Sequence, residues 1–142
     1  MDYYQIVATL SLAIQIVVLV LLIRAVWLKR MKNLRQHGIT MIIAVVLHTL
    51  TILTWMIPSF SNLFTPSGSL NLADMLTMAI MGHAFTGFVA AILGIWMSAS
   101  WRLKADMKTC FGKKSFMRVT IILWLISLTI GIILYLKIIQ LF

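Results

Sequence analysis

Residues 5–28 read QIVATLSLAIQIVVLVLLIRAVWL, a run in which Arg24 is the only charged side chain. About 20 apolar residues are enough for a helix to cross the hydrocarbon core of a bilayer. Three further apolar stretches of similar length follow at residues 39–60, 72–101 and 119–142. Because lipid offers the backbone no hydrogen-bond partner, each stretch is expected to be a helix. The sequence therefore predicts an all-α integral membrane protein, an antiparallel bundle of four transmembrane helices.

The composition of the 142 residues supports this fold class. Hydrophobic residues make up 62% of the chain and charged residues only 11%, whereas soluble domains have about 25% charged residues. A soluble, disordered or disulfide-stapled protein is therefore excluded. Four spans leave only short connections, so we expect residues 1–142 to form a single transmembrane domain.

Basic residues are distributed unevenly among the three connections. The chain has 12 Lys and Arg against 3 Asp and Glu, and most of the cations lie in or beside residues 29–38 and 102–118. The connection at residues 61–71 has none. The positive-inside rule then places the first and third connections in the cytoplasm and both termini outside. Since topology accounts for the positive charge, we expect the lipid bilayer, and not nucleic acid, to be the partner of these cations.

Signatures of catalysis are scarce. The chain has no Glu, and Asp2, Asp74 and Asp106 are scattered, so paired carboxylates for acid and base catalysis are excluded within one chain. Glycine-rich phosphate loops, nucleophile elbows and His-Glu-x-x-His zinc motifs are also missing from the sequence. We expect a protein that is not an enzyme, in which any chemistry would belong to a bound cofactor.

Two histidines lie within the apolar spans, at His48 and His83. Ionisable groups at membrane depth are costly and usually face the bundle interior. Counted from the outer ends of their spans at about 1.5 Å per residue, the two lie about 18 Å and about 13 Å deep. Two imidazoles on facing helices are the ligands of a six-coordinate b-type haem, which makes His48 and His83 candidate cofactor ligands. The alternative is that each hydrogen-bonds a hydroxyl or carbonyl of a neighbouring helix.

A second candidate set begins the third span, where Met75, Met78 and Met81 precede His83. Thioethers with one imidazole suit cuprous copper, so these four residues form a candidate metal site. Steps of three residues, however, spread the sulfurs over about 120° of helix surface, which favours haem over copper. The alternative is that these methionines are flexible apolar fillers.

Small residues recur further along the same span, at Gly87, Ala90, Gly94 and Ser98. Such a stripe lets another helix approach closely, and it predicts an interface within the bundle or with another membrane-protein subunit. It also leaves a trough below His83 that a flat cofactor or a lipid tail would fit, although packing is the favoured interpretation.

Several of these positions resemble the CtaM/YozB-type family of small four-span membrane proteins, whose members carry a domain of unknown function. The resemblance covers the last three spans and rests on residues 113–124, KKSFMRVTIILW, followed by Ser127, Thr129, Gly131 and Tyr135, on Met81-Gly82-His83, and on His37 before Met41. The chain has Lys113 where the family usually has a histidine. His37 is a candidate functional position by this resemblance, and an interfacial polar anchor otherwise.

The resemblance implies a role in the maturation of haem-copper terminal oxidases. We therefore expect a non-enzymatic accessory or assembly protein of a respiratory complex, in a prokaryotic plasma membrane, with other membrane subunits as partners and with haem or copper as candidate cofactors. Two alternatives remain open from the residues. One is a small b-type cytochrome with haem between His48 and His83, and the other is a structural subunit of a membrane complex.

Overall fold

The computed structural model describes residues 3–64, 74–101, 108 and 112–140, and the described chain is helical. Four helical segments are long and apolar enough to cross a membrane, as predicted. They are α1 (Tyr3–Arg30), a continuous second segment that begins with α2 (Leu34–Thr51), α4 (Met75–Trp101) and α6 (Lys114–Gln140). The second and fourth segments begin five residues before the corresponding predicted spans. Basic and polar residues at a membrane surface can stay helical because their side chains reach water.

The second segment changes its helical form near its outer end. α2 passes into a π-helical turn, η1 (Ile52–Met56), and then into α3 (Ile57–Leu63). Pro58 lies just beyond η1, where it has no N–H to donate and its ring crowds the preceding turn. The wider π turn, in which the N–H of Ile57 bonds to the carbonyl of Ile52, accommodates that proline without ending the helix.

A tight turn joins α1 to α2. The N–H of Asn33 bonds to the carbonyl of Leu28 at 3.1 Å and that of Lys32 to the carbonyl of Lys29 at 3.1 Å, which is the Schellman pattern of a helix end. Lys32 has a φ of 58°, in the left-handed region that favours glycine. The Asn33 side chain then caps α2 by accepting the N–H of Gln36. The two helices therefore run antiparallel as a hairpin.

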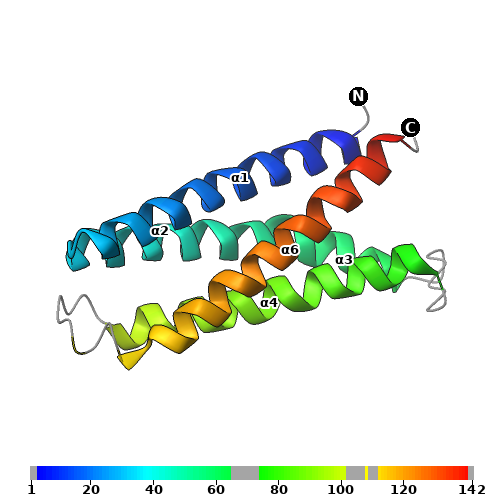
Figure 1. Cartoon of the computed structure of the whole chain (residues 1–142). Helices are drawn as coiled ribbons and strands as arrows, with labels where there is room; N and C mark the ends of the chain where they lie inside the picture. The colour runs from blue at the N-terminus through cyan, green and yellow to red at the C-terminus, as the bar shows by residue number, and fades with distance from the viewer. Residues whose placement is uncertain (1–2, 65–73, 102–107, 109–111, 141–142) are drawn as a thin grey trace.

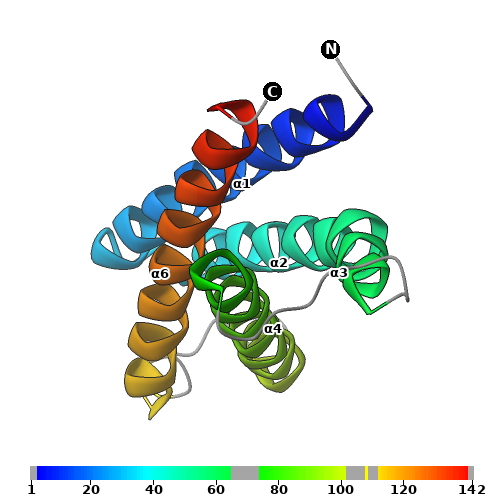
Figure 2. The ribbon, with the colours of Figure 1, turned by 90° about the vertical axis from the view of Figure 1, so that its right-hand side faces the viewer.

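The bundle consists of two such helix pairs. α1 packs along α2, α4 packs along α6, and α6 rises from the far end of α4 toward the start of α1 (Figure 1). Thr9 on α1 and Tyr135 on α6 share a hydrogen bond of 3.1 Å where these helices meet. The view down the bundle shows that the helices cross obliquely (Figure 2). The core lies at the crossing and includes Val18, Ala44 and Trp124.

The small-residue stripe of α4 is used inside this bundle. Gly87, Ala90 and Gly94 are buried. A Cβ at Gly94 would lie 2.9 Å from a methyl group of Val45 on α2, and one at Gly87 would lie 3.0 Å from the hydroxyl of Ser127 on α6. Ser98 is half-buried and lines a cavity described below. The sequence left open whether the stripe packs within the bundle or against another membrane-protein subunit. In the structure Gly87 and Gly94 make contacts within the chain.

Candidate functional site

His48 projects from α2 into the centre of the bundle and is 2% exposed. The side-chain amide of Gln15 on α1 lies 3.4 Å from its Nδ1, and its Nε2 lies 3.2 Å from the carbonyl of Gly87 on α4. One tautomer satisfies both contacts, with the amide donating to Nδ1 and Nε2–H donating to the carbonyl. The indole ring of Trp124 on α6 meets the imidazole edge-on, with ring centroids 4.9 Å apart. His48 therefore contacts all three other spans.

His83 lies one turn before Gly87 on α4 and faces α6. Its Nδ1 donates to the carbonyl of Ser127 at 2.8 Å, and the hydroxyl of Ser127 donates back to the carbonyl of His83 at 3.3 Å. The backbone of Gly131 leaves room for the ring, because a Cβ there would lie 2.9 Å from its Cε1. His83 thus joins α4 to α6 as His48 joins α2 to α4.

These groups form one polar cluster to which all four spans contribute. We call it the histidine cluster, and it consists of Gln15, His48, His83, Gly87, Trp124 and Ser127. Most of its polar atoms are paired, but the indole N–H of Trp124 is buried without a hydrogen-bond partner in the described chain. A fully paired network in a medium of low dielectric constant holds its helices in one arrangement. The network is therefore incomplete at this indole N–H.

The cluster does not fit a haem held between the two histidines. Each imidazole would have to turn one ring nitrogen with a free lone pair toward the iron. Both nitrogens of His48 face protein groups, and its ring lies directly against the backbone of α4. Neither histidine lines the large cavity described below. Ligation by this pair would therefore require α2 to separate from α4, and the geometry supports the alternative of interhelical hydrogen bonds.

The candidate copper ligands are not brought together. Met75 and Met78 are 88% and 60% exposed on the outer surface of α4, whereas His83 faces α6. Within the described residues no group of three or more His, Cys, Asp or Glu side chains could hold a metal ion. The exposed thioethers are placed where side chains would meet lipid, as expected of apolar fillers.

His37 occupies a different region, at the end of the bundle that the basic connections share. Its ring is buried, and its Nδ1 donates to the carbonyl of Ala25 on α1 at 2.7 Å. Beside it, the indole of Trp101 lies directly over the backbone of Gly38, where a Cβ would overlap the ring. His37 is thus neither a free surface anchor nor a part of the histidine cluster. It belongs to the wall of a cavity.

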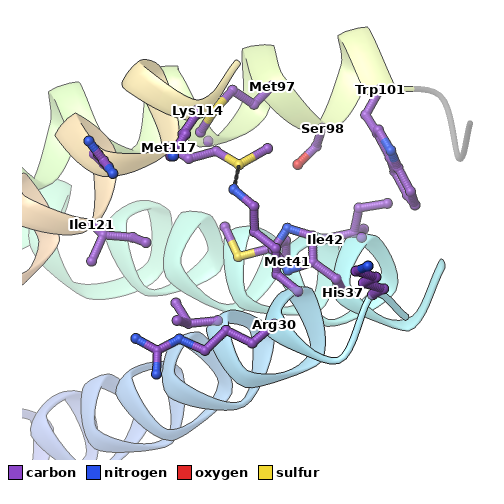
Figure 3. Close-up of a pocket in the computed structure, with 16 residues that line it drawn as sticks. Arg30, His37, Met41, Ile42, Met97, Ser98, Trp101, Lys114, Met117 and Ile121 are labelled. Atoms are coloured by element: carbon purple, nitrogen blue, oxygen red, sulfur yellow. Dashed lines mark hydrogen bonds between the residues drawn. The ribbon is translucent and has the colours of Figure 1, made fainter. Parts of the chain in front are cut away.

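That cavity has a volume of about 540 Å³ and opens between the two helix pairs (Figure 3). Cations line it from both pairs: Lys29, Arg30, Lys32, Lys114 and Arg118. Methionine and isoleucine side chains line it further in, among them Met41, Met97 and Ile121. The sequence indicated topology and contact with lipid for these cations, but not a common site. In the structure, cations from two separate connections line one cavity.

Comparison of the chain with protein-family models, with curated proteins and with solved structures found no match. Membership of the CtaM/YozB-type family stays a prediction from the residues quoted above.

Proposed function

We propose that this chain is a non-enzymatic accessory protein of a prokaryotic plasma membrane that assists the assembly of a respiratory complex, and that it acts by helix contacts. The complex implied by the family resemblance is a haem-copper oxidase. In this proposal the chain is needed while the complex is built and does not itself carry electrons.

One observation carries the proposal. Among the residues on which the resemblance rests, His83 on α4 and Trp124, Ser127 and Gly131 on α6 come from two different spans, yet they lie together in the bundle. Trp124 packs against the imidazole of His48, and Ser127 and Gly131 pack against that of His83. Trp124 and Ser127 are almost fully buried. Residues that resemble a family pattern and gather around the two imidazoles are best explained by a common need for this arrangement of the four spans.

The geometry also favours an accessory role over a small cytochrome. An electron carrier needs a redox group, and both ring nitrogens of His48, one of the two histidines that would hold it, lie within hydrogen-bond distance of protein groups on α1 and α4. A rigid bundle with a large apolar outer surface is suited to contacts with other membrane helices, which in lipid depend on close packing and interhelical hydrogen bonds.

Deletion of the gene in its own organism tests the proposal. Membranes of the deletion strain should lose haem-copper oxidase activity and the corresponding haem absorbance, while oxidases of other types keep theirs. The wild-type chain should restore both, and Thr54→Ala, at an exposed position of η1, should restore them equally. His83→Ala should restore them poorly, because it removes the link between α4 and α6.

Two results would contradict this function. If the deletion strain keeps normal oxidase activity, the chain has no part in assembly. If the chain co-purifies in equal amount with the mature, active oxidase, it is a structural subunit instead of an accessory protein. An assembly factor should be found with incomplete oxidase and be depleted from the finished complex.

A further inference from the structure

The cavity between the helix pairs is positively charged. Lys29, Arg30 and Lys32 contribute from the α1 side, and Lys114 and Arg118 from α6. None of its described lining residues is acidic. The connection at residues 102–113 contains a single carboxylate, Asp106, which could offset at most one of these five cations. The mouth of the cavity is therefore a site for an anion.

The polarity of the walls changes with depth. The cations lie near the ends of the helices, while the deepest lining residues, Gly94 and Ile121, lie seven residues inside Trp101 and Lys114. Seven residues of helix correspond to about 10 Å, so the cavity extends from the charged surface layer into the apolar part of the spans. At this inner end Met41, Met97 and Ile121 form apolar walls. A ligand that fills it must be anionic at one end and apolar at the other.

Lys32 adds an independent observation. Its backbone has a φ of 58°, a conformation that favours glycine at the end of a helix. A lysine at this position is strained, yet its side chain lines the cavity. Such conformations cluster at functional sites such as ligand clamps. The Lys32 side chain is a third cation of the cavity lining, with Lys29 and Arg30.

The geometry points to a binding site for an anionic phospholipid, with its phosphate between the cations of α1 and α6 and the first part of one acyl chain in the apolar inner part of the cavity. Basic pockets between transmembrane helices on the cytoplasmic side are suited to lipid headgroups, and each nearby cation strengthens attraction to an anionic lipid. The guanidinium groups of Arg30 and Arg118 can each donate two parallel hydrogen bonds to phosphate oxygens. The volume of about 540 Å³ falls within the range of small-molecule pockets, about 300 to 1,000 Å³. A bound lipid would bridge the two helix pairs.

Native mass spectrometry of the full chain in mild detergent tests this site with two probes, dioleoylphosphatidylglycerol and the zwitterionic dioleoylphosphatidylcholine. The wild-type chain should bind the anionic lipid at least about tenfold more tightly. Lys114→Gln with Arg118→Gln should weaken its binding by about 25-fold, about fivefold per cation. The matched control for Lys114→Gln alone, which should weaken binding about fivefold, is Lys137→Gln, which removes one lysine charge from the opposite end of α6 and should leave the affinity unchanged.

Two further variants separate the lipid from other anions and from general charge effects. Ser98→Phe keeps every cation but fills the cavity, so it should weaken phosphatidylglycerol binding as well. Lys32→Gly should raise the midpoint of unfolding of the lipid-free chain, because it relieves the left-handed lysine, and should at the same time weaken lipid binding.

The proposal is overturned if Lys137→Gln weakens binding as much as Lys114→Gln alone, since attraction would then be spread over the surface. It is also overturned if Ser98→Phe binds the lipid normally, or if inorganic phosphate at millimolar concentration displaces it. The last result would show a simple phosphate site without a place for the acyl chain.

Discussion

Gly94→Ala is the substitution for which the structure makes the sharpest stability prediction. The glycine lies where α4 crosses α2, and a Cβ would lie 2.9 Å from Val45 Cγ2, 3.7 Å from its Cγ1 and 3.9 Å from the ring of Trp124. The first distance is too short for a carbon–carbon contact, and both neighbours are buried in the core. Either Val45 must leave its rotamer or the helices must move apart.

The same substitution at Gly82 provides the control. Gly82 is on the same helix, and its Cβ would meet only Ile130 Cδ1, at 3.9 Å, an ordinary contact. Each alanine gains about 1 kcal/mol from its higher helix propensity. At Gly94 this gain is offset by overpacking, which costs about 1 to 3 kcal/mol. We therefore expect Gly82→Ala to be stabilising, and Gly94→Ala to be less stable than Gly82→Ala by about 1 to 3 kcal/mol.

The free energy of unfolding of both variants can be measured in detergent micelles by titration with sodium dodecyl sulfate, followed by circular dichroism. The difference between the two alanines is the measured quantity, because it cancels the propensity gain. If Gly94→Ala is as stable as Gly82→Ala, the close contact between α4 and α2 does not exist, and the small-residue stripe does not pack inside the chain.

The fold and the histidine cluster give four other predictions. Reporter fusions after Phe142 should show an extracytoplasmic C-terminus, and a cytoplasmic reading would overturn the topology derived from the basic connections. His48→Ala should lower the free energy of unfolding by about 2 to 4 kcal/mol, because it leaves a cavity and removes the contacts with Gln15 and with the carbonyl of Gly87. The dithionite-reduced spectrum of the purified wild-type protein should show no haem band that depends on His48. A haem band that is present in the wild type and absent from His48→Ala would support His48 as a haem ligand. Tyr135→Phe and Thr9→Val should each cost about 0.5 to 1.5 kcal/mol, and a double-mutant cycle without coupling would show that α1 and α6 do not share their hydrogen bond.

The number and character of the spans followed from the sequence because the bilayer restricts the alternatives. A chain with four apolar runs has only helices available for crossing lipid, and four helices are found near the predicted residues. The helix ends were less accurate. α6 begins at Lys114 and not at residue 119, since hydropathy marks the hydrocarbon core, whereas a helix continues into the surface layer. The π-helical turn before Pro58 was not predicted either, because the spacing of the apolar residues does not reveal it.

The candidate sites depended more strongly on tertiary structure. The sequence identified His48 and His83 as unusual and placed them at similar depths, but depth does not determine which way a side chain points around its helix. The packing directs one ring to the backbone of Gly87 and the other to Ser127. The stripe that includes Gly87 and Gly94 was compatible with an internal or an external interface, and only the position of Val45 decided between them.

The sequence alone thus determined the helical class of this protein and its four long apolar segments. It also predicts a lipid environment and the side of the membrane for the cations, because each of these properties depends on composition along one segment. Only the tertiary structure decided which polar groups meet and where space remains. The basic cavity is the clearest case, because its walls come from α1, α2, α4 and α6. Such a cavity cannot be recognised in the sequence of any single helix. It depends on how the four helices cross, and side-chain packing across the whole bundle sets that crossing.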